Sequence, residues 1–390
     1  MNIKSLKMPE QRKKKLIIGG TIVLLVTVII VLIALYASNE QVRVFIDRNI
    51  LRKEILENDV VKIELNSQEN ASIYAYKKYI TVLSKNILTT YNSTGKKEYQ
   101  HEIPISNPIY AANNRFLVIA EKKGSEIYVV SEANISWQAQ VEGQIEKINI
   151  NKNGYVTVIT SGTSYKTVVV TYSPQGKELF KTYLSNTIAL KADISNDNKY
   201  LSIAEVNISG TLIQSNIKTI SLEKAQSDPR NSVIHTYQAE PNELITDIKY
   251  QDRGKLVCMY DSGIHLMQNQ KDESILGFLD NKVVSATVNL EDYLMYTVEK
   301  TVNIFSTNTQ VLFKNVNTEK ENLYTVNSTI KSIESYGQNV ALNTGSEVLF
   351  VNTTGWLQKK YISTQEISDI VLAENVAIIV YKDKIEIINL

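Results

Sequence analysis

The segment ADISNDNKYLSIAE, residues 192–205, contains the pattern that decides the fold. Apolar and polar residues alternate on both sides of a short cluster of Ser, Asn and Asp, which predicts a strand, a tight turn and a second strand. The same pattern recurs at residues 73–82, 109–118, 148–160, 247–260, 286–299, 332–344 and 369–382. Self-similarity of this kind indicates a repeat architecture, so the chain past residue 58 is expected to be an array of similar all-β units.

The length of the repeat identifies the unit. The first apolar residue of each second strand marks its position: Ile80, Phe116, Val156, Leu201, Leu256, Leu294, Val340 and Val376. Successive markers are 36 to 55 residues apart and average about 42, which is typical of a four-stranded β-propeller blade. Third strands are expected at residues 126–130, 301–305 and 347–351, and positive φ is expected at three turn glycines, Gly95, Gly176 and Gly355. The predicted fold class is all-β, a β-propeller of eight four-stranded blades.

Two features of the array bear on the closure of the ring and on the number of blades. The last unit has only three strands, near residues 367–372, 375–381 and 383–390, whereas a surplus strand at residues 60–65 precedes the first unit. Because an open ring would leave unpaired strand edges, we expect residues 60–65 to pair with residues 384–390. A ring of seven blades remains an alternative if the long fourth unit, with an insertion around residues 207–216, is not a blade.

Residues 16–37 form an uncharged apolar stretch near the N-terminus. As a helix this stretch would be about 33 Å long, which matches a hydrocarbon core of about 30 Å, so we predict one transmembrane helix in contact with the lipid bilayer. Four consecutive basic residues, Arg12 to Lys15, precede it, and the positive-inside rule therefore places the N-terminus in the cytoplasm. A cleaved signal peptide is the competing interpretation, but its apolar part is usually only about 7–15 residues long.

These features divide the chain into four predicted parts: a cytoplasmic basic tail at residues 1–15, the transmembrane helix at residues 16–37, a juxtamembrane stalk at residues 38–58 and an extracytoplasmic β-propeller at residues 59–390. The predicted location is the cell membrane, which the chain crosses once. The formal net charge is +1 and the part beyond the tail is nearly balanced. A nucleic-acid binder would carry a basic stripe, so a nucleic-acid partner is not expected.

Hairpins at residues 151–156 and 194–203 resemble the strand–turn–strand units of WD-repeat-like and quinoprotein-like propellers. No recurrent Gly-His or Trp-Asp pair is present and the chain has two tryptophans, so this resemblance implies the fold and no quinone cofactor. The whole layout, including the juxtamembrane run at residues 42–54, resembles an uncharacterised family of N-terminally membrane-anchored β-propeller proteins of low-GC Gram-positive bacteria, a domain of unknown function. That resemblance implies anchorage and fold, without an activity.

Residues with catalytic or metal-binding potential are few and scattered. The three histidines, His101, His235 and His265, fall in predicted strands without metal-ligand spacing, and the single cysteine, Cys258, lies in an apolar run. The sequence has no glycine-rich phosphate loop and no GxSxG nucleophile elbow. The Asp/Asn cluster at residues 195–198 occupies a predicted turn. We therefore predict no catalytic residue, no cofactor and no metal site.

The predicted function is that of a non-enzymatic binding or scaffold module, held at the membrane, for a protein or cell-envelope ligand outside the cell. Two alternatives stay open. The first is an enzyme, a hydrolase or lyase, whose site is formed in the central channel by acidic residues from separate strands. The second is a sensor, which would require a cytoplasmic partner because the predicted tail has only 15 residues.

Overall fold

The computed structural model describes residues 10–38, 42, 46–47, 50–51, 53–54, 60–66, 68–268, 271–303 and 306–390. The chain forms two compact units, Met1–Ile55 and Leu56–Leu390. Most of the predicted basic tail and of the predicted stalk lies outside the described residues. The first unit contains one long helix, and the second contains the strands β1 to β32.

The long helix of the first unit, α1 (Glu10–Ser38), contains the predicted membrane segment. Among the described residues it is the one helix long and apolar enough to cross a membrane, over Ile18–Ser38. Large apolar side chains along it, such as Leu24, are exposed. A helix satisfies its own backbone hydrogen bonds, so such a surface is compatible with lipid.

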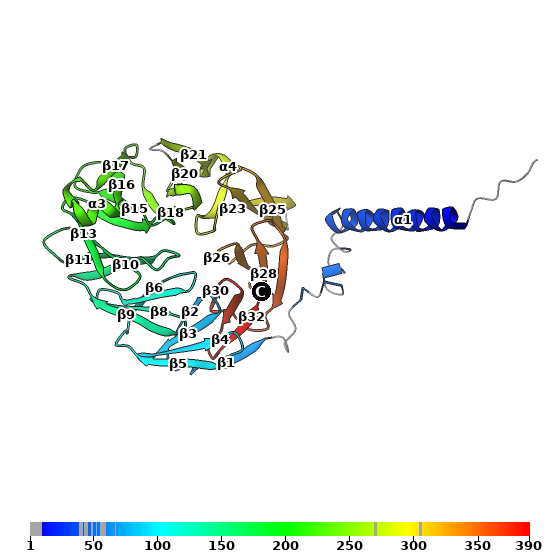
Figure 1. The fold of residues 1–390 in the computed structure, drawn as a ribbon, viewed down its shortest axis with the longest axis horizontal. Helices are drawn as coiled ribbons and strands as arrows, with labels where there is room; N and C mark the ends of the chain where they lie inside the picture. Colours follow the sequence, from blue (N-terminus) through cyan, green and yellow to red (C-terminus); the bar gives the residue numbers. More distant parts are fainter. Residues whose placement is uncertain are drawn as a thin grey trace, which may run out of the picture. The chain divides into compact units, whose positions relative to one another are not determined.

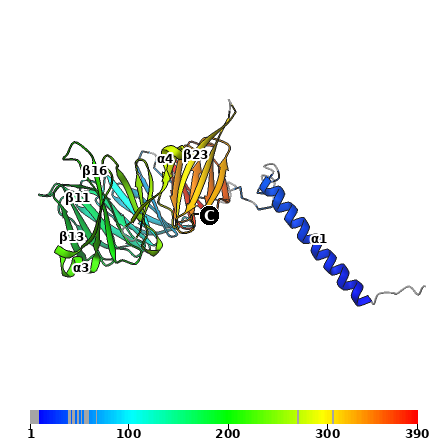
Figure 2. The ribbon, with the colours of Figure 1, turned by 90° about the horizontal axis from the view of Figure 1, so that it is seen from above.

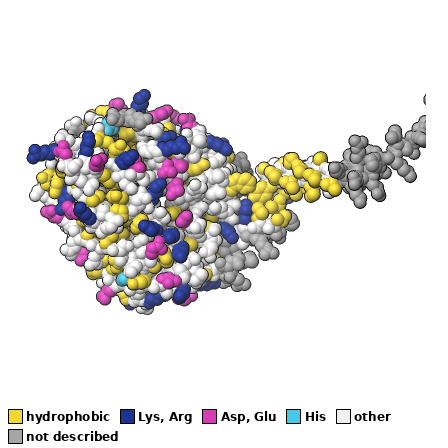
Figure 3. All heavy atoms as spheres, in the orientation of Figure 1, with side chains coloured by type: hydrophobic (Ala, Val, Ile, Leu, Met, Phe, Trp, Pro, Cys, Tyr) yellow, Lys and Arg dark blue, Asp and Glu magenta, His cyan; other side chains and the backbone are white. Residues whose placement is uncertain are grey.

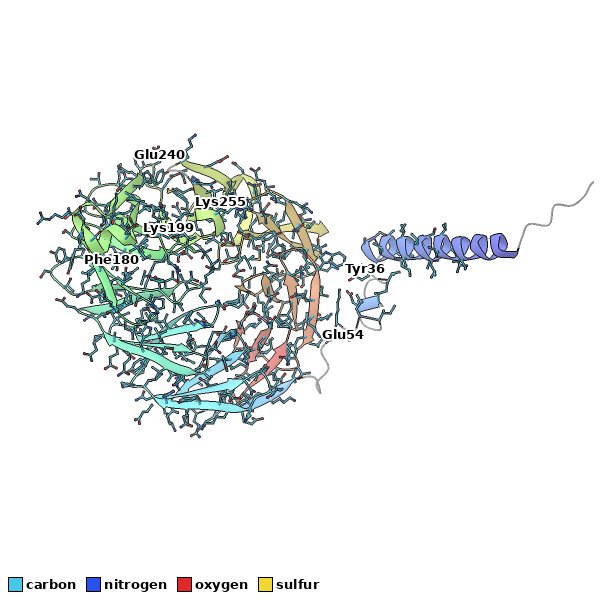
Figure 4. The ribbon with its side chains drawn as sticks, in the orientation of Figure 1. Tyr36, Glu54, Phe180, Lys199, Glu240 and Lys255 are labelled. Atoms are coloured by element: carbon cyan, nitrogen blue, oxygen red, sulfur yellow. The ribbon has the colours of Figure 1, made fainter. Side chains whose placement is uncertain are left out.

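A polar cluster lies at the C-terminal end of α1. The hydroxyl of Tyr36, labelled in Figure 4, donates to Asp47 (2.7 Å). Lys53 pairs with the same carboxylate (2.9 Å) and donates to the Tyr36 hydroxyl (2.8 Å). An aromatic ring with a polar tip at the end of an apolar helix is typical of a membrane–water interface.

The second unit is a ring of eight four-stranded antiparallel sheets, arranged as the blades of a propeller (Figure 1). Blade 1 contains β2 (Ser72–Tyr76), β3 (Tyr79–Ser84), β4 (Ile87–Asn92) and β5 (Lys97–Glu102). Blade 2 contains β6 (Pro108–Asn113), β7 (Phe116–Glu121), β8 (Glu126–Ser131) and β9 (Asn134–Gln140). Blade 3 contains β10 (Gln144–Ile150), β11 (Val156–Ser161), β12 (Thr167–Tyr172) and β13 (Glu178–Leu184). Blade 4 contains β14 (Ile188–Ile194), β15 (Tyr200–Asn207), β16 (Gln214–Ser221) and β17 (Val233–Gln238).

The other half of the ring repeats this order. Blade 5 contains β18 (Ile245–Tyr250), β19 (Leu256–Tyr260), β20 (Gly263–Gln268) and β21 (Lys271–Gly277). Blade 6 contains β22 (Val283–Thr287), β23 (Tyr293–Asn303), β24 (Ser306–Asn315) and β25 (Glu321–Val326), and blade 7 contains β26 (Ser332–Tyr336), β27 (Asn339–Asn343), β28 (Glu347–Asn352) and β29 (Leu357–Ile362). Blade 8 combines β30 (Asp369–Leu372), β31 (Val376–Val380) and β32 (Lys384–Asn389) with β1 (Val61–Glu64). The prediction of eight four-stranded blades is confirmed, and the seven-blade alternative is wrong because the long fourth unit is a blade.

Each blade packs against the next through its apolar second and third strands. The marker residues from Ile80 to Val376 are all buried, and each lies at the beginning of a second strand, so the predicted repeat register is confirmed. In the core between blades 2 and 3, Val118 and Val129 pack with Val158 from the next blade. Because neighbouring blades bury one another's apolar side chains, a blade is stable only as part of the ring.

β1 closes the ring. It pairs antiparallel with β32, with Val61 opposite Ile387 and Ile63 opposite Ile385. Val61 also lies against the turn between β4 and β5, because a Cβ at Gly95 would be 2.5 Å from its Cγ1. The expected pairing of the surplus strand with the C-terminal strand is therefore confirmed.

The turns that lead to fourth strands have the conformation that their sequence predicts. Gly95, Gly176 and Gly355 have φ of +77°, +78° and +79°, a region that favours glycine. The side chain of Asn92 accepts hydrogen bonds from the backbone N–H groups of Thr94 (3.0 Å) and Lys96 (3.1 Å). Local hydrogen bonds of this kind define the turn independently of the rest of the blade.

Two details of the fold differ from the sequence prediction. The third strand predicted at residues 301–305 is wrong, because Thr301 to Asn303 form the end of β23 and the third strand is β24. Alternation continues past Val298 without a turn signal, and the β23–β24 hairpin is therefore long (Figure 2); residues 304 and 305 lie outside the described residues. Short helices also join strands: α3 (Leu222–Ser227), α4 (Phe278–Asn281), and 3₁₀ turns at Pro229–Asn231 and Asp252–Gly254. Helices of this length have too few residues to give a periodic pattern.

Amide side chains connect successive blades near the axis of the ring. In each case an Asn or Gln at or just beyond one strand donates to a backbone carbonyl of the next blade. The amide–carbonyl pairs are Asn113–Ile150 (3.2 Å), Asn151–Ser195 (3.4 Å), Gln251–Leu290 (3.0 Å) and Asn339–Glu374 (3.0 Å). These bonds fix the turns that they join, and those turns surround one end of the central channel.

Candidate functional site

The first strands of the blades surround a central channel. Going around the ring, β2, β6, β10, β14 and β18 contact one another in turn, and β26, β30 and β2 do so on the other side (Figure 1). Since the strands of each blade are antiparallel, the turns between first and second strands all lie at one end of the channel. We call this ring of turns the channel mouth; it consists of residues 77–78, 114–115, 151–155, 195–199, 251–255, 288–292, 337–338 and 373–375.

The channel mouth contains a cavity of about 390 Å³ that is lined by blades from different sides of the ring. Its walls include Asn114, Lys152, Glu291, Tyr336, Gln338 and Glu374. A cavity of about 400 Å³ in the channel shares Glu291 and Tyr336 with it. A groove of about 590 Å³ between blades 4 and 5 reaches the mouth at Asn196 and Asp252. A ligand at the mouth therefore has connected hollows into which it can extend.

Several polar groups at the mouth are available to a ligand. The carboxylates of Glu291 and Glu374 and the amide of Gln338 form no side-chain hydrogen bond or ion pair within the described part of the chain. Burial, together with the negative charges of Glu291 and Glu374, raises the pKa of Tyr336 to about 12. The Tyr336 phenol is therefore a neutral hydrogen-bond donor at neutral pH.

Lys191 and Lys249, deeper in the channel, are already bonded to the protein. Lys191 pairs with Asp247 of the next blade (3.4 Å), and Lys249 donates to the carbonyl of Asn289 (2.8 Å). Burial lowers the pKa of Lys249 and raises the pKa of Asp193. These groups hold the first strands together, whereas the groups at the mouth have unused bonding capacity.

Inside the channel, the negative charge of one carboxylate acts on a second carboxylate that comes from a separate first strand. Glu334 comes from β26 and Asp369 from β30; burial, with the negative charge of Asp369, raises the pKa of Glu334. Burial and both carboxylates also raise the pKa of Tyr110, from β6. The sequence does not reveal this group, because its members are distant in the chain and meet only when the ring forms.

The histidines lie in the strands that the sequence predicts, and the structure does not bring them together. His101 is in β5 and stacks on Tyr99 (ring centroids 4.6 Å apart), and His235 is in β17. His265 is in β20, where its Nδ1 pairs with Asp272 (2.6 Å). No group of three or more His, Cys, Asp or Glu that could hold a metal ion occurs among the residues that the structure describes.

The Asp/Asn cluster at residues 195–198 forms the turn that the sequence predicts. The hydroxyl of Ser195 donates to Asp197 (2.7 Å) and accepts the backbone N–H of Tyr200 (3.0 Å). Lys199, labelled in Figure 4 with Lys255 from the neighbouring blade, pairs with Asp197 (3.4 Å). Asn198 accepts a hydrogen bond from Asn151 (2.8 Å) and Asn196 donates to Asp252 (2.8 Å), so the polar groups of this cluster stabilise the turn and join it to the neighbouring blades.

Comparison by sequence places the chain in a family. It belongs to a family of unknown function (DUF5711), whose profile matches residues 53–390. A search of curated proteins finds no match. The resemblance to an uncharacterised family is thus confirmed at the level of the family, while its anchorage and its bacterial source remain predictions.

Comparison by structure confirms the propeller fold. The C-terminal WD40 domain of Sif2 is 12% identical and matches 85% of this chain and 99% of its own length, with a TM-score of 0.54. Sqt1 of Chaetomium thermophilum, bound to the N-terminus of ribosomal protein L10, is 10% identical over 86% of this chain and all of its own, with a TM-score of 0.52. BamB of Moraxella catarrhalis is 12% identical over 84% of this chain and 96% of its own, with a TM-score of 0.49. At these identities the similarity concerns the fold alone.

Proposed function

We propose that this member of the DUF5711 family is a membrane-anchored, extracytoplasmic binding module that holds a protein or cell-envelope ligand at the channel mouth. The observation that carries the proposal is the cavity of about 390 Å³ bordered by Glu291, Gln338 and Glu374. These polar side chains form no side-chain hydrogen bond or ion pair within the described part of the chain. Concave sites with a few convergent polar groups are the usual places for ligands.

The hydrogen bonds and ion pairs of the lysines in the channel argue against a catalytic role for these lysines. The interior lysines are bonded to neighbouring blades, as Lys191 is to Asp247. A catalytic base or nucleophile must instead reach a substrate with its reactive group free. The Sqt1 structure, in which a propeller is bound to a protein N-terminus, is a precedent for the fold in a binding role.

The anchoring part of the proposal comes from the apolar helix. Ile18–Ser38 is long enough to cross a bilayer, and basic residues precede it from Arg12 to Lys15. The positive-inside rule then places the propeller outside the cytoplasm. Fixed to the membrane in this way, the module would present its mouth to ligands in the cell envelope.

Photocrosslinking in intact cells tests the proposal. A photoreactive amino acid replaces Gln338 or Asn375, which are exposed residues of the mouth, and in control variants it replaces Ser164 or Thr211, which are exposed in turns at the opposite end of the blades. We expect a reproducible crosslinked species from the mouth positions and none from the controls. Equal capture at both ends of the blades, or capture only from the controls, would show that the mouth is not the binding site.

The alternative of a hydrolase or lyase has one specific observation in its favour. Glu334 and Asp369 are carboxylates in one channel, and the raised pKa of Glu334 is a property of general acids. Purified full-length protein is incubated with cell-wall glycan and peptide fractions, next to a Glu334→Gln variant. Cleavage by the wild type that the variant lacks would favour the enzyme over the binding module.

A further inference from the structure

Charges are unevenly distributed among the turns of the channel mouth. The turns of blades 1 to 3 contain basic residues and no acidic residue: Lys77, Lys78, Arg115 and Lys152. The turns of blades 6 to 8 contain acidic residues and no basic residue: Glu291, Asp292 and Glu374. The turns of blades 4 and 5 contain both signs. The mouth therefore has a basic side and an acidic side.

The basic side keeps an excess of positive charge after its ion pairs are counted. Lys77 pairs with Glu132 (3.0 Å), and Lys152 pairs with Asp252 (3.1 Å). No carboxylate pairs with the other two basic groups in the described part of the chain, and each lies over the ring of the next residue: Lys78 over Tyr79 (5.5 Å to the centroid) and Arg115 over Phe116 (5.0 Å). An aromatic ring attracts a cation without neutralising it, so both positive charges remain available.

The acidic side keeps its negative charge in the same way. Asp292 accepts a hydrogen bond from the amide of Asn317 (3.0 Å), a neutral donor. Glu291 and Glu374 form no ion pair within the residues that the structure describes. Both carboxylates act on the phenol of Tyr336, which lies between them on the cavity wall.

The channel interior does not repeat this division. The first strands of blades 3 to 5 carry Lys147, Lys191 and Lys249 but also Glu146, Asp193 and Asp247, and those of blades 7 and 8 carry Glu334 and Asp369. Figure 3 shows basic and acidic side chains near the middle of the ring on the face that it draws. The separation of charge is therefore a property of the turns of the mouth.

Both sides of the mouth border one cavity. Asn114 and Lys152 line it from the basic side, and Glu291 and Glu374 line it from the acidic side. Its volume of about 390 Å³ is that of a few amino-acid residues, so one short ligand contacts both sides. Opposed charges across a single site select a ligand that carries opposed charges itself.

We infer that the ligand of the mouth is a peptide segment with a basic group and an acidic group a few residues apart, the basic group against blades 6 to 8 and the acidic group against blades 1 to 3. The inference rests on the proposed function and names the ligand class for that site. Asn114 and Gln338 each offer a donor and an acceptor, which is what a peptide bond requires. A nucleic acid would be repelled by the acidic side, and a neutral glycan would leave the charges of both sides unpaired.

Four synthetic peptides test the ligand class. Each has about ten residues, an acetylated N-terminus, an amidated C-terminus and a fluorescein label: one has lysines at one end and aspartates at the other, one has only the lysines, one has only the aspartates, and one is neutral. Binding to the full chain in phosphatidylcholine nanodiscs is measured by fluorescence anisotropy at about 50 mM salt, where screening is weak. We expect the bipolar peptide to bind about tenfold more tightly than each of the other three.

Charge variants of exposed side chains test the two sides separately. Glu291→Gln combined with Glu374→Gln should remove the advantage of the bipolar peptide over the aspartate peptide, and Lys78→Gln combined with Arg115→Gln should remove its advantage over the lysine peptide. Glu240→Gln, labelled in Figure 4, is the matched control, since it neutralises an exposed carboxylate in a turn at the opposite end of the blades. This control should bind like the wild type.

The outcomes separate this inference from the proposed function. A bipolar peptide that binds no better than the lysine or aspartate peptide would overturn the inference, and so would binding unchanged by the mouth variants. If the protein instead associates with itself and the same variants abolish that association, the inference would also be overturned. The charge pattern would then belong to a contact between copies of the protein. If no peptide binds while Gln338 still captures a partner in cells, the ligand class is wrong and the binding site at the mouth stands.

Discussion

Asp193 connects three blades, and its burial makes the stability of the ring depend on pH. Its carboxylate accepts the backbone N–H of Tyr250 (2.7 Å) and the amide of Asn149 (2.8 Å). Burial raises the pKa of Asp193 above its ordinary value. The native state therefore holds this proton more tightly than the unfolded state, so the contribution of Asp193 is fully present below about pH 4 and is lost as the pH rises through the raised pKa.

We therefore expect Asp193→Asn to flatten part of this pH dependence. As the pH rises from about 4 through the raised pKa of Asp193, the free energy of unfolding of the wild type should fall relative to that of the variant, because asparagine has no proton to lose. Urea unfolding at a series of pH values measures this difference. Glu240→Gln, which changes an exposed carboxylate, is the control, and parallel profiles of Asp193→Asn and wild type would contradict the prediction.

Cys258 reports on unfolding because the native fold conceals it. Its side chain is completely buried in β19, and burial raises the pKa of the thiol. Thiol reagents attack the thiolate, so the native protein should not be labelled. In increasing urea, labelling should rise together with the loss of the β-sheet circular dichroism signal. A cysteine in place of the exposed Thr211 should react at once, and rapid labelling of native Cys258 would show that blade 5 opens locally.

At the scale of elements, the β1–β32 pairing is expected to stabilise the whole ring. Leu65 donates its backbone N–H to Asp383 (2.7 Å), so by strand alternation the N–H of Ile63 also faces β32, whereas that of Glu64 faces away. Ile63→Pro should lower the free energy of unfolding by about 3 kcal/mol or more, because it removes a ladder bond and adds strain. Thermal unfolding measures the loss. Glu64→Pro is the matched control and should cost much less; equal melting temperatures for both variants would argue against this role of β1.

The hydrogen bonds that Asn and Gln side chains form between blades lead to a second prediction at this scale. Asn151 is buried, donates to the Ser195 carbonyl of the next blade and accepts the N–H groups of Asn153 and Tyr155 in its own turn. Asn151→Ala should lower the free energy of unfolding by about 1–3 kcal/mol, since it leaves buried groups unpaired. Asn153→Ala, at a neighbouring exposed position, should have a smaller effect. Chemical denaturation measures the free energy of unfolding of both variants, and equal losses for the two would contradict this prediction.

The elements also show what sequence can predict. Turn chemistry at Gly95 and the alternation around Val340 are local, and the strands and turns that they predict are present. The long β23–β24 hairpin was not predicted, because apolar and polar residues continue to alternate through Thr301 without a turn signal. The position of the turn there depends on how far β23 and β24 remain paired. The helix α3 was not predicted from the sequence, because its capping residue, Ser221, and its two buried residues are too few to give a helical period of hydrophobic residues.

At the scale of the whole molecule, the candidate site was less predictable than the fold. Charges such as Glu291 and Arg115 are visible in the sequence, but their separation into two sides requires the order of the blades around the ring. The meeting of Glu334 with Asp369 likewise depends on first strands that lie side by side only in the closed propeller. The strands and turns of a single blade can be predicted from the local sequence pattern. The surface that several blades form together cannot, because it depends on how the blades are arranged in the closed ring.

The orientation of the molecule in the membrane gives a prediction at this scale. Protease added to intact protoplasts should remove the propeller, because Arg12 to Lys15, at the start of α1 and before its apolar part, predict that the chain beyond Ser38 lies outside. Immunoblotting for a C-terminal tag follows the loss, and a cytoplasmic protein that stays intact is the control. A protected fragment of the size of the propeller would place the ring in the cytoplasm.

The closure of the ring by β1 has a mechanical consequence. β1 is the first strand after the apolar helix, so in the proposed membrane-anchored arrangement a pull from the membrane would act on the N-terminal end of the strand that completes blade 8. That end lies beside the C-terminal end of β32. The force would therefore break the hydrogen bonds between β1 and β32 one after another, beginning at Val61. Blade 8 also contributes Glu374 to the mouth. Tension on the proposed membrane anchor would thus loosen the ring at a blade of the proposed binding site, and the affinity for a ligand there would depend on the force applied.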